Sequence, residues 1–197
     1  QQLYDLAAEE WQTFVKEYPN DPYIGNAQHY LGVCYFQTED FEKADRAFEA
    51  ANDENGKREV KAEVAISSTL LNQGLARFNL GQSKKGDDAT KALLAAITTF
   101  RRLKAEFPGA DEEDEADYYL AEALFAVGKK DAARKIYEQA VNSSPQHPLR
   151  EKMLYGLGVA YQETEDAKKA RSAFERLLRE FPQSEFTDEI TTRRADT

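Results

Sequence analysis

The sequence predicts an all-α protein, a right-handed α-α superhelix of about four and a half helical hairpins followed by a C-terminal capping helix. Two observations lead to this fold class. First, apolar residues recur at helical spacing in stretches that the six prolines separate, and proline disfavours helix both at and before its own position. Second, a long internal match indicates that these stretches are copies of one repeated unit.

The internal match sets the length of the unit. Residues 31–49 return as residues 157–175, with 12 identical positions among 19, and Pro108, Pro145 and Pro182 are spaced 37 residues apart. A unit of about this length accommodates two helices. We therefore expect one solenoid domain over residues 1–197, composed of a half repeat (1–20), four repeats (21–56, 57–109, 110–146 and 147–182) and a capping helix (183–197).

Glycine stands at one phase of the first helix in three units, at Gly32, Gly74 and Gly158. A glycine inside a helix costs about 1 kcal/mol relative to alanine, so a close approach by the partner helix is the expected reason for it. Large residues of the second helices are expected to fill the layer between hairpins. These residues are Trp11, Phe48, Phe100, Tyr137 and Phe174.

The third unit is longer than the others. Gly74 and Pro108 are 34 residues apart, whereas Gly158 and Pro182 are 24 apart. The ten additional residues are predicted to lengthen both helices of this unit around residues 83–86.

Composition excludes several functions. The 26 basic and 36 acidic residues give a net charge of −10, which repels nucleic acid. No apolar run approaches the roughly 18 residues of a spanning helix, so no direct membrane insertion is expected. Residues 1–56 carry a charge of −9 and residues 57–110 a charge of +5. This contrast, together with the terminal repeats, makes a homo-oligomer a further option.

Catalytic motifs are absent. Gly81 and Gly86 have the spacing of a phosphate-binding loop, but Asp87 and Asp88 follow where Lys and Ser or Thr belong. The single Cys34 fits a small buried thiol better than a nucleophile. We therefore expect no enzyme, no catalytic residue, no metal site and no cofactor.

A groove lined by the first helices is the predicted binding site, because stacked hairpins form an extended surface on which their first helices lie. Aromatic and amide side chains share this face and suit a bound peptide or protein segment. A ring at this phase can also pack sideways against the next helix, and for the phenylalanines both interpretations stay open. The predicted site residues are Asn26, His29, Phe36, Gln37, Leu71, Leu75, Phe78, Asn79, Tyr118, Glu122, Phe125, Lys152, Tyr155 and Gln162.

The pattern inside each unit resembles the tetratricopeptide repeat (TPR). In that family Leu-Gly, a Tyr three residues later, an Ala, an aromatic four residues after it and a closing Pro recur. The last unit carries all of these, at 157–158, 161, 170, 174 and 182. The resemblance implies a non-catalytic scaffold that binds proteins or peptides.

The turns between repeats resemble one branch of this family, the bacterial cell-envelope proteins that include the Tol-Pal system coordinator and the outer-membrane assembly lipoprotein. They read Tyr-Pro at residues 18–19 and Phe-Pro at residues 107–108 and 181–182, followed by a polar stretch. This resemblance implies a periplasmic or cell-envelope location, with the cytoplasm as the alternative. The long third unit departs from the coordinator pattern, so no partner is transferred from it.

Two other functions are compatible with the sequence. One is a self-assembling structural scaffold whose terminal repeats pair between molecules, and the other is the accessory interaction domain of a larger enzyme. A clamp for C-terminal carboxylates is disfavoured, because repeats of that kind carry Lys and Asn on successive turns of the groove helix, whereas this chain has His29 and Val33 there.

Overall fold

The computed structural model describes residues 1–57, 65–143 and 145–195, and these residues form ten α-helices and no strand. The all-α prediction is confirmed for this part of the chain. The chain divides into two compact units, Gln1–Ala116 and Asp117–Thr197, and each is described by itself.

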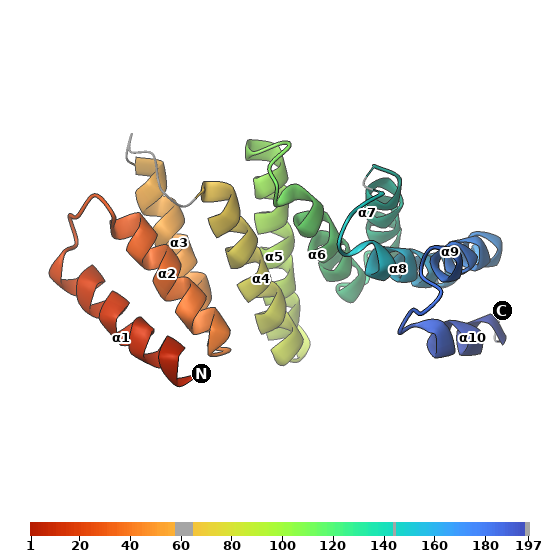
Figure 1. The fold of residues 1–197 in the computed structure, drawn as a ribbon, viewed down its shortest axis with the longest axis horizontal. Helices are drawn as coiled ribbons and strands as arrows, with labels where there is room; N and C mark the ends of the chain where they lie inside the picture. The colour runs from red at the N-terminus through yellow and green to blue at the C-terminus, as the bar shows by residue number, and fades with distance from the viewer. Residues whose placement is uncertain (58–64, 144, 196–197) are drawn as a thin grey trace. The chain divides into compact units, whose positions relative to one another are not determined.

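The first unit is a row of helices in which each packs on the next (Figure 1). Its helices are α1 (Gln2–Glu17), α2 (Ile24–Gln37), α3 (Phe41–Lys57), α4 (Ile66–Ser83) and α5 (Gly86–Glu106). The second unit comprises most of α6 (Glu113–Ala126), whose first residues belong to the first unit, together with α7 (Lys130–Ser143), α8 (Arg150–Glu163), α9 (Ala167–Glu180) and α10 (Thr187–Ala195).

Glycine–aromatic contacts hold three of the hairpins together, as the sequence predicts. A Cβ added to Gly32 would lie 2.6 Å from Cε1 of Phe48. The equivalent distance is 2.3 Å from Gly74 to Phe100, and also 2.3 Å from Gly158 to Phe174. These separations are far inside van der Waals contact, so any side chain at the glycine would displace the ring. We call these three glycines and Ala121, which holds the same place in α6, the seam positions.

The third hairpin has longer helices, and the prediction for the ten additional residues is confirmed. Helix α4 has 18 residues and α5 has 21, whereas α8 and α9 have 14 each. In the other hairpins the first helix ends in a left-handed residue seven positions after the seam, at Glu39, Gly128 and Glu165 (φ 63°, 78° and 60°). The corresponding Gly81 is still within α4, and the left-handed residue follows later, at Gly86.

A buried arginine ties together three helices of the second unit. The guanidinium of Arg150 at the start of α8 pairs with Glu180 at 2.7 Å and donates to the carbonyl of Val141 at 2.6 Å. The carbonyl belongs to the last turn of α7, whose terminal carbonyls lack partners within the helix. Arg150 therefore joins the end of α7 to the end of α9.

Candidate functional site

The first unit buries half of its predicted site residues. Asn26, His29, Leu71 and Phe78 are each less than a tenth exposed. The His29 ring is hydrogen-bonded with Thr69 Oγ1 of α4 at 2.9 Å and meets the Phe48 ring edge-on at 5.6 Å. Burial lowers the pKa of His29 to about 4. Because α2 and α4 lie this close, these positions offer little surface to a ligand.

The other predicted residues of the first unit lie nearer the surface. Phe36 is half-buried, with its ring 5.4 Å from that of Phe41, and Gln37 is exposed. Leu75 and Asn79 are half-buried, and the Asn79 amide donates to the Leu75 carbonyl at 2.9 Å. No cavity described in the first unit is lined by these four residues.

The second unit brings five predicted residues together around one cavity of about 320 Å³. Helix α6 contributes Tyr118, Glu122 and Phe125, and helix α8 contributes Lys152 and Tyr155. Gln162, the remaining predicted residue, lies outside the cavity lining and donates to the Arg193 carbonyl at 3.2 Å. We call this space the α6–α8 cavity.

The polar end of the cavity is formed by Glu122 and Tyr137. The Tyr137 ring is 1% exposed, and its hydroxyl donates a hydrogen bond to the Glu122 carboxylate. Burial raises the pKa of Glu122, and the hydrogen bond from Tyr137 opposes that rise. Tyr137 reaches this carboxylate past Gly156, where an added Cβ would lie 2.7 Å from the ring carbon Cζ.

Helix α10 closes one side of the cavity. The Phe186 ring, just before this helix, stacks on Tyr155 with centroids 4.4 Å apart and planes 14° apart. The Tyr155 hydroxyl donates to Glu189, and the Arg193 guanidinium lies 5.9 Å from the centre of the same ring. Tyr155 is therefore covered on one side and lines the cavity on the other.

Val159, on the predicted groove face of α8, also lines the cavity, whereas four lining residues were not predicted for that face: Tyr137, Gly156, Phe186 and Arg193. Tyr137 was expected only as a packing residue between hairpins. Gly156 stands two residues before the seam Gly158, and this second glycine is the sequence signal of the close approach. Nothing in the helical pattern of α8 indicates Phe186 or Arg193, because they come from a separate segment of the chain.

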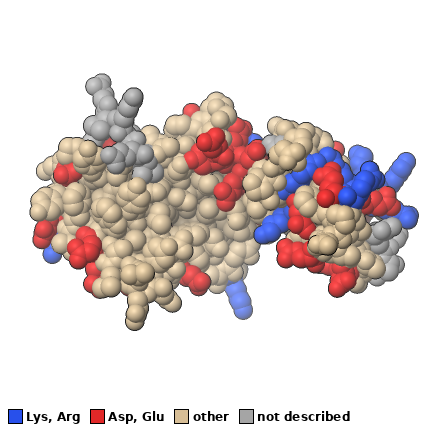
Figure 2. Space-filling view, in the orientation of Figure 1, with Lys and Arg blue, Asp and Glu red and all other residues tan. Residues whose placement is uncertain are grey.

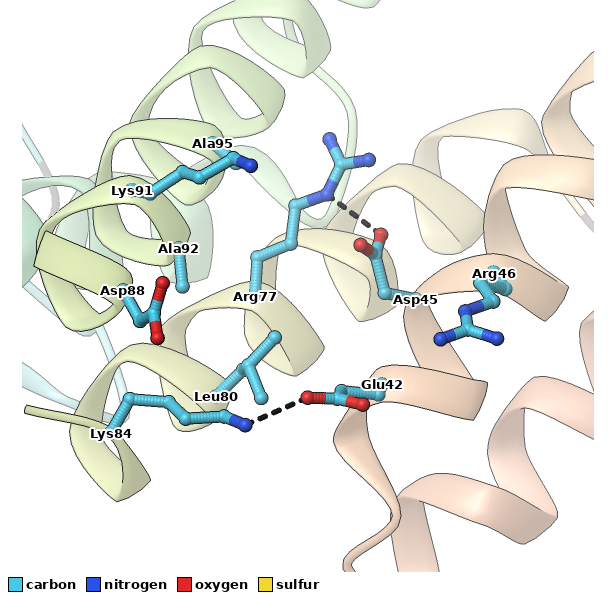
Figure 3. Close-up of a pocket in the computed structure, with 10 residues that line it drawn as sticks. All are labelled: Glu42, Asp45, Arg46, Arg77, Leu80, Lys84, Asp88, Lys91, Ala92 and Ala95. Carbon is cyan, nitrogen blue, oxygen red and sulfur yellow. Dashed lines mark hydrogen bonds and ion pairs between the residues drawn. The ribbon is translucent and has the colours of Figure 1, made fainter.

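A second cavity, of about 420 Å³, lies among α3, α4 and α5 in the first unit. Figure 3 shows Arg77 reaching from α4 to Asp45 and Lys84 reaching to Glu42, with ion-pair distances of 2.7 and 2.8 Å. Arg77 stands three residues after its seam glycine, where Tyr35 and Tyr161 stand in other hairpins. The charges of Arg77 and Lys84 are paired with carboxylates of helix α3, and these ion pairs join two hairpins. Because these cations already have partners within the chain, the α6–α8 cavity is the better candidate for a ligand site.

Among the described residues, no group of three His, Cys, Asp or Glu side chains is placed to hold a metal ion. No helix in residues 1–57, 65–143 and 145–195 has the length and apolar character to cross a membrane. Figure 2 shows basic side chains gathered over part of the second unit. Helix α9 of this unit carries five basic residues, Lys168, Lys169, Arg171, Arg176 and Arg179.

Comparison with known proteins identifies the repeat. Residues 112–179 match the tetratricopeptide repeat family model. No curated protein matches the chain.

Solved structures share the fold over nearly the whole chain. The TPR protein TTC0263 of Thermus thermophilus is 14% identical, with a TM-score of 0.60, over 98% of this chain and 89% of its own. YrrB, described as a TPR protein with an unusual peptide-binding site, is 16% identical, with a TM-score of 0.69, over 98% and 85%. Bacillus thuringiensis PlcR, solved with the peptide PapR7 and DNA, is 12% identical, with a TM-score of 0.59, over 100% and 68%. Residues 112–179 thus match the tetratricopeptide repeat, and the chain has the fold of tetratricopeptide-repeat proteins.

Proposed function

We propose that this chain is a non-catalytic interaction module that binds a peptide or protein segment in the α6–α8 cavity. The observation that carries the proposal is the cavity itself, which gathers five residues selected from sequence as a binding face. Aromatic walls bury much area at low entropic cost, and the Glu122 carboxylate supplies a polar contact. Peptide binding by YrrB and the peptide complex of PlcR support this class of ligand.

The test selects ligands directly. A random peptide library displayed on phage is enriched on the full chain, and the best peptide is titrated by fluorescence anisotropy. Tyr118→Ala should weaken its binding at least about tenfold, the equivalent of 1.4 kcal/mol. Tyr23→Ala, which removes an exposed tyrosine of the first unit, is the matched control and should leave affinity unchanged. If Tyr118→Ala binds as tightly as the control, the cavity is not the site.

A self-assembling scaffold is the second candidate, and the surface of α1 favours it. Leu3 is 81% exposed and Leu6 is 60% exposed, so an apolar stripe of this helix is uncovered. Trp11, the single tryptophan, lies half-buried on α1, so its fluorescence is a probe for a second molecule that packs on this helix. Pairing through α1 should shift Trp11 fluorescence to shorter wavelength as protein concentration rises, with a matching rise in mass by light scattering. A constant monomer mass would remove this candidate.

For the compartment, we propose the bacterial cell envelope, with the cytoplasm as the alternative. The support is the sequence of the turns at residues 18–23, 107–111 and 181–186. Fractionation of a bacterium that expresses the complete parent gene tests this, and recovery with cytoplasmic markers would overturn it. The length of that gene also decides whether the chain is an accessory domain of an enzyme.

A further inference from the structure

Building on the proposed function, we propose that the α6–α8 cavity takes a basic side chain, Lys or Arg, of the bound segment. Glu122 is its counter-ion, and the aromatic rings of the cavity are its walls. This assigns a charge preference to the same site, which the proposed function leaves open.

The charge of the exposed Lys152 acts on the Glu122 carboxylate, but among the described residues the two form no ion pair. The hydrogen bond to this carboxylate comes from the Tyr137 hydroxyl, and no ion pair reaches it among the described residues. Glu122 is half-buried, and a partly desolvated carboxylate without a paired cation is costly, because its desolvation is not offset by a close opposite charge. A guest ammonium or guanidinium at this end of the cavity would supply that charge.

The cavity walls are suited to a cation. Tyr118, Phe125 and Tyr155 line the same space, and aromatic rings attract ammonium and guanidinium groups. A contact of this kind is already present at the cavity, where the Arg193 guanidinium lies 5.9 Å from the centre of the Tyr155 ring. Arg193 is paired with Glu189 at 3.1 Å, so it satisfies a different carboxylate.

Lys152 distinguishes a basic guest side chain from an acidic one. Its side chain is exposed at the edge of the cavity, and its charge lowers the pKa of Glu122 without an ion pair to it. A basic guest competes with Lys152 for the same carboxylate, whereas an acidic guest would need Lys152 as its partner. Removing this charge therefore strengthens one class of ligand and weakens the other. The net charge of −10 also attracts basic segments from a distance.

The experiment uses a set of peptides, Ac-Ala-Leu-Ala-Xaa-Ala-Leu-Ala-NH2, in which Xaa is Lys, Arg, norleucine or Glu. Affinity for the full chain is measured by NMR titration. The Lys and Arg peptides should bind about tenfold more tightly than the norleucine peptide. Glu122→Gln, which keeps an acceptor for Tyr137, should abolish this preference. Lys152→Gln should tighten the Lys peptide by roughly twofold to threefold.

The outcomes separate the two proposals. Equal affinity for the Lys and norleucine peptides, with both lost in Tyr118→Ala, would keep the peptide site and overturn the charge preference. Tightest binding by the Glu peptide, weakened by Lys152→Gln, would overturn it in favour of an acidic guest. Binding by none of the four peptides, together with failure of the phage selection, would overturn both. The melting temperatures of Glu122→Gln and Lys152→Gln should stay close to that of the unchanged chain, so that a change in peptide affinity is not caused by unfolding of the variant.

Discussion

Residues at equivalent positions of the repeat are buried in the first unit and line a cavity in the second. His29, Leu71, Tyr118 and Tyr155 each stand three residues before the seam position of their helix. In the first unit His29 and Leu71 are buried, whereas in the second unit Tyr118 and Tyr155 line a cavity. A position within the repeat therefore does not decide whether a residue is available to a ligand.

One difference between α8 and the first helices of the first unit lies two positions before the seam. In the first unit the residue at that position is Tyr30 or Asn72, and the Tyr30 ring stacks on Trp11 with centroids 5.5 Å apart. In the last hairpin it is Gly156, which leaves space that the Tyr137 ring enters. The hydroxyl of that ring then holds Glu122 at the cavity. The glycine of α8 thus gives the Tyr137 ring room beside the cavity.

The largest expected effect tests what the two units share. Phe48→Ala in the first unit and Phe174→Ala in the second should each lower the free energy of unfolding by about 3–5 kcal/mol, because both rings are fully buried against a seam glycine. Urea unfolding followed by circular dichroism measures this. Tyr23→Ala, at an exposed ring, should change it by less than about 0.5 kcal/mol. A cost near that of the control at either ring would show that the seam does not hold that hairpin.

A smaller effect concerns the buried histidine of the first unit. The pKa of His29 is lowered from 6.5 to about 4, so the unfolded chain binds a proton in this range and the folded chain does not. Stability is therefore complete above about pH 6.5 and falls as the pH drops towards 4, by up to about 2 kcal/mol from this group after allowance for solvent. Unfolding of the unchanged chain and of His29→Gln, compared at pH values across this range, measures the difference. Parallel pH profiles would mean that His29 is protonated as easily in the folded chain.

The smallest effect on stability is also the sharpest test of the comparison. Gly156→Ala places a Cβ about 2.7 Å from the Tyr137 ring, so the ring must move. The strain, offset in part by the higher helix propensity of alanine, should cost about 1–2 kcal/mol. Peptide affinity should fall more than this loss of stability explains, because the hydrogen bond to Glu122 is displaced. A variant that keeps full affinity would show that Gly156 does not shape the site.

Much of the fold was predictable because it depends on local patterns. Prolines, helical spacing and the internal match locate the helices, and the seam glycines with their aromatic partners are found from their phase alone. The Gly74–Phe100 contact survives ten additional residues because these extend both helices before the chain turns. The cavity was predictable only in part, since the pattern selects a helix face and not the neighbour that covers it.

Sequence by itself determined the repeat, its seam and the absence of a recognisable catalytic motif, because each depends on residues at fixed spacing within one or two helices. Only the tertiary structure decided that the His29 ring is hydrogen-bonded with Thr69, that the Tyr137 hydroxyl donates to Glu122, and that the Phe186 ring stacks on Tyr155. These contacts join side chains from helices separated by turns. Whether such a contact forms depends on how closely the two helices approach, and the periodicity along one helix carries no information about that distance.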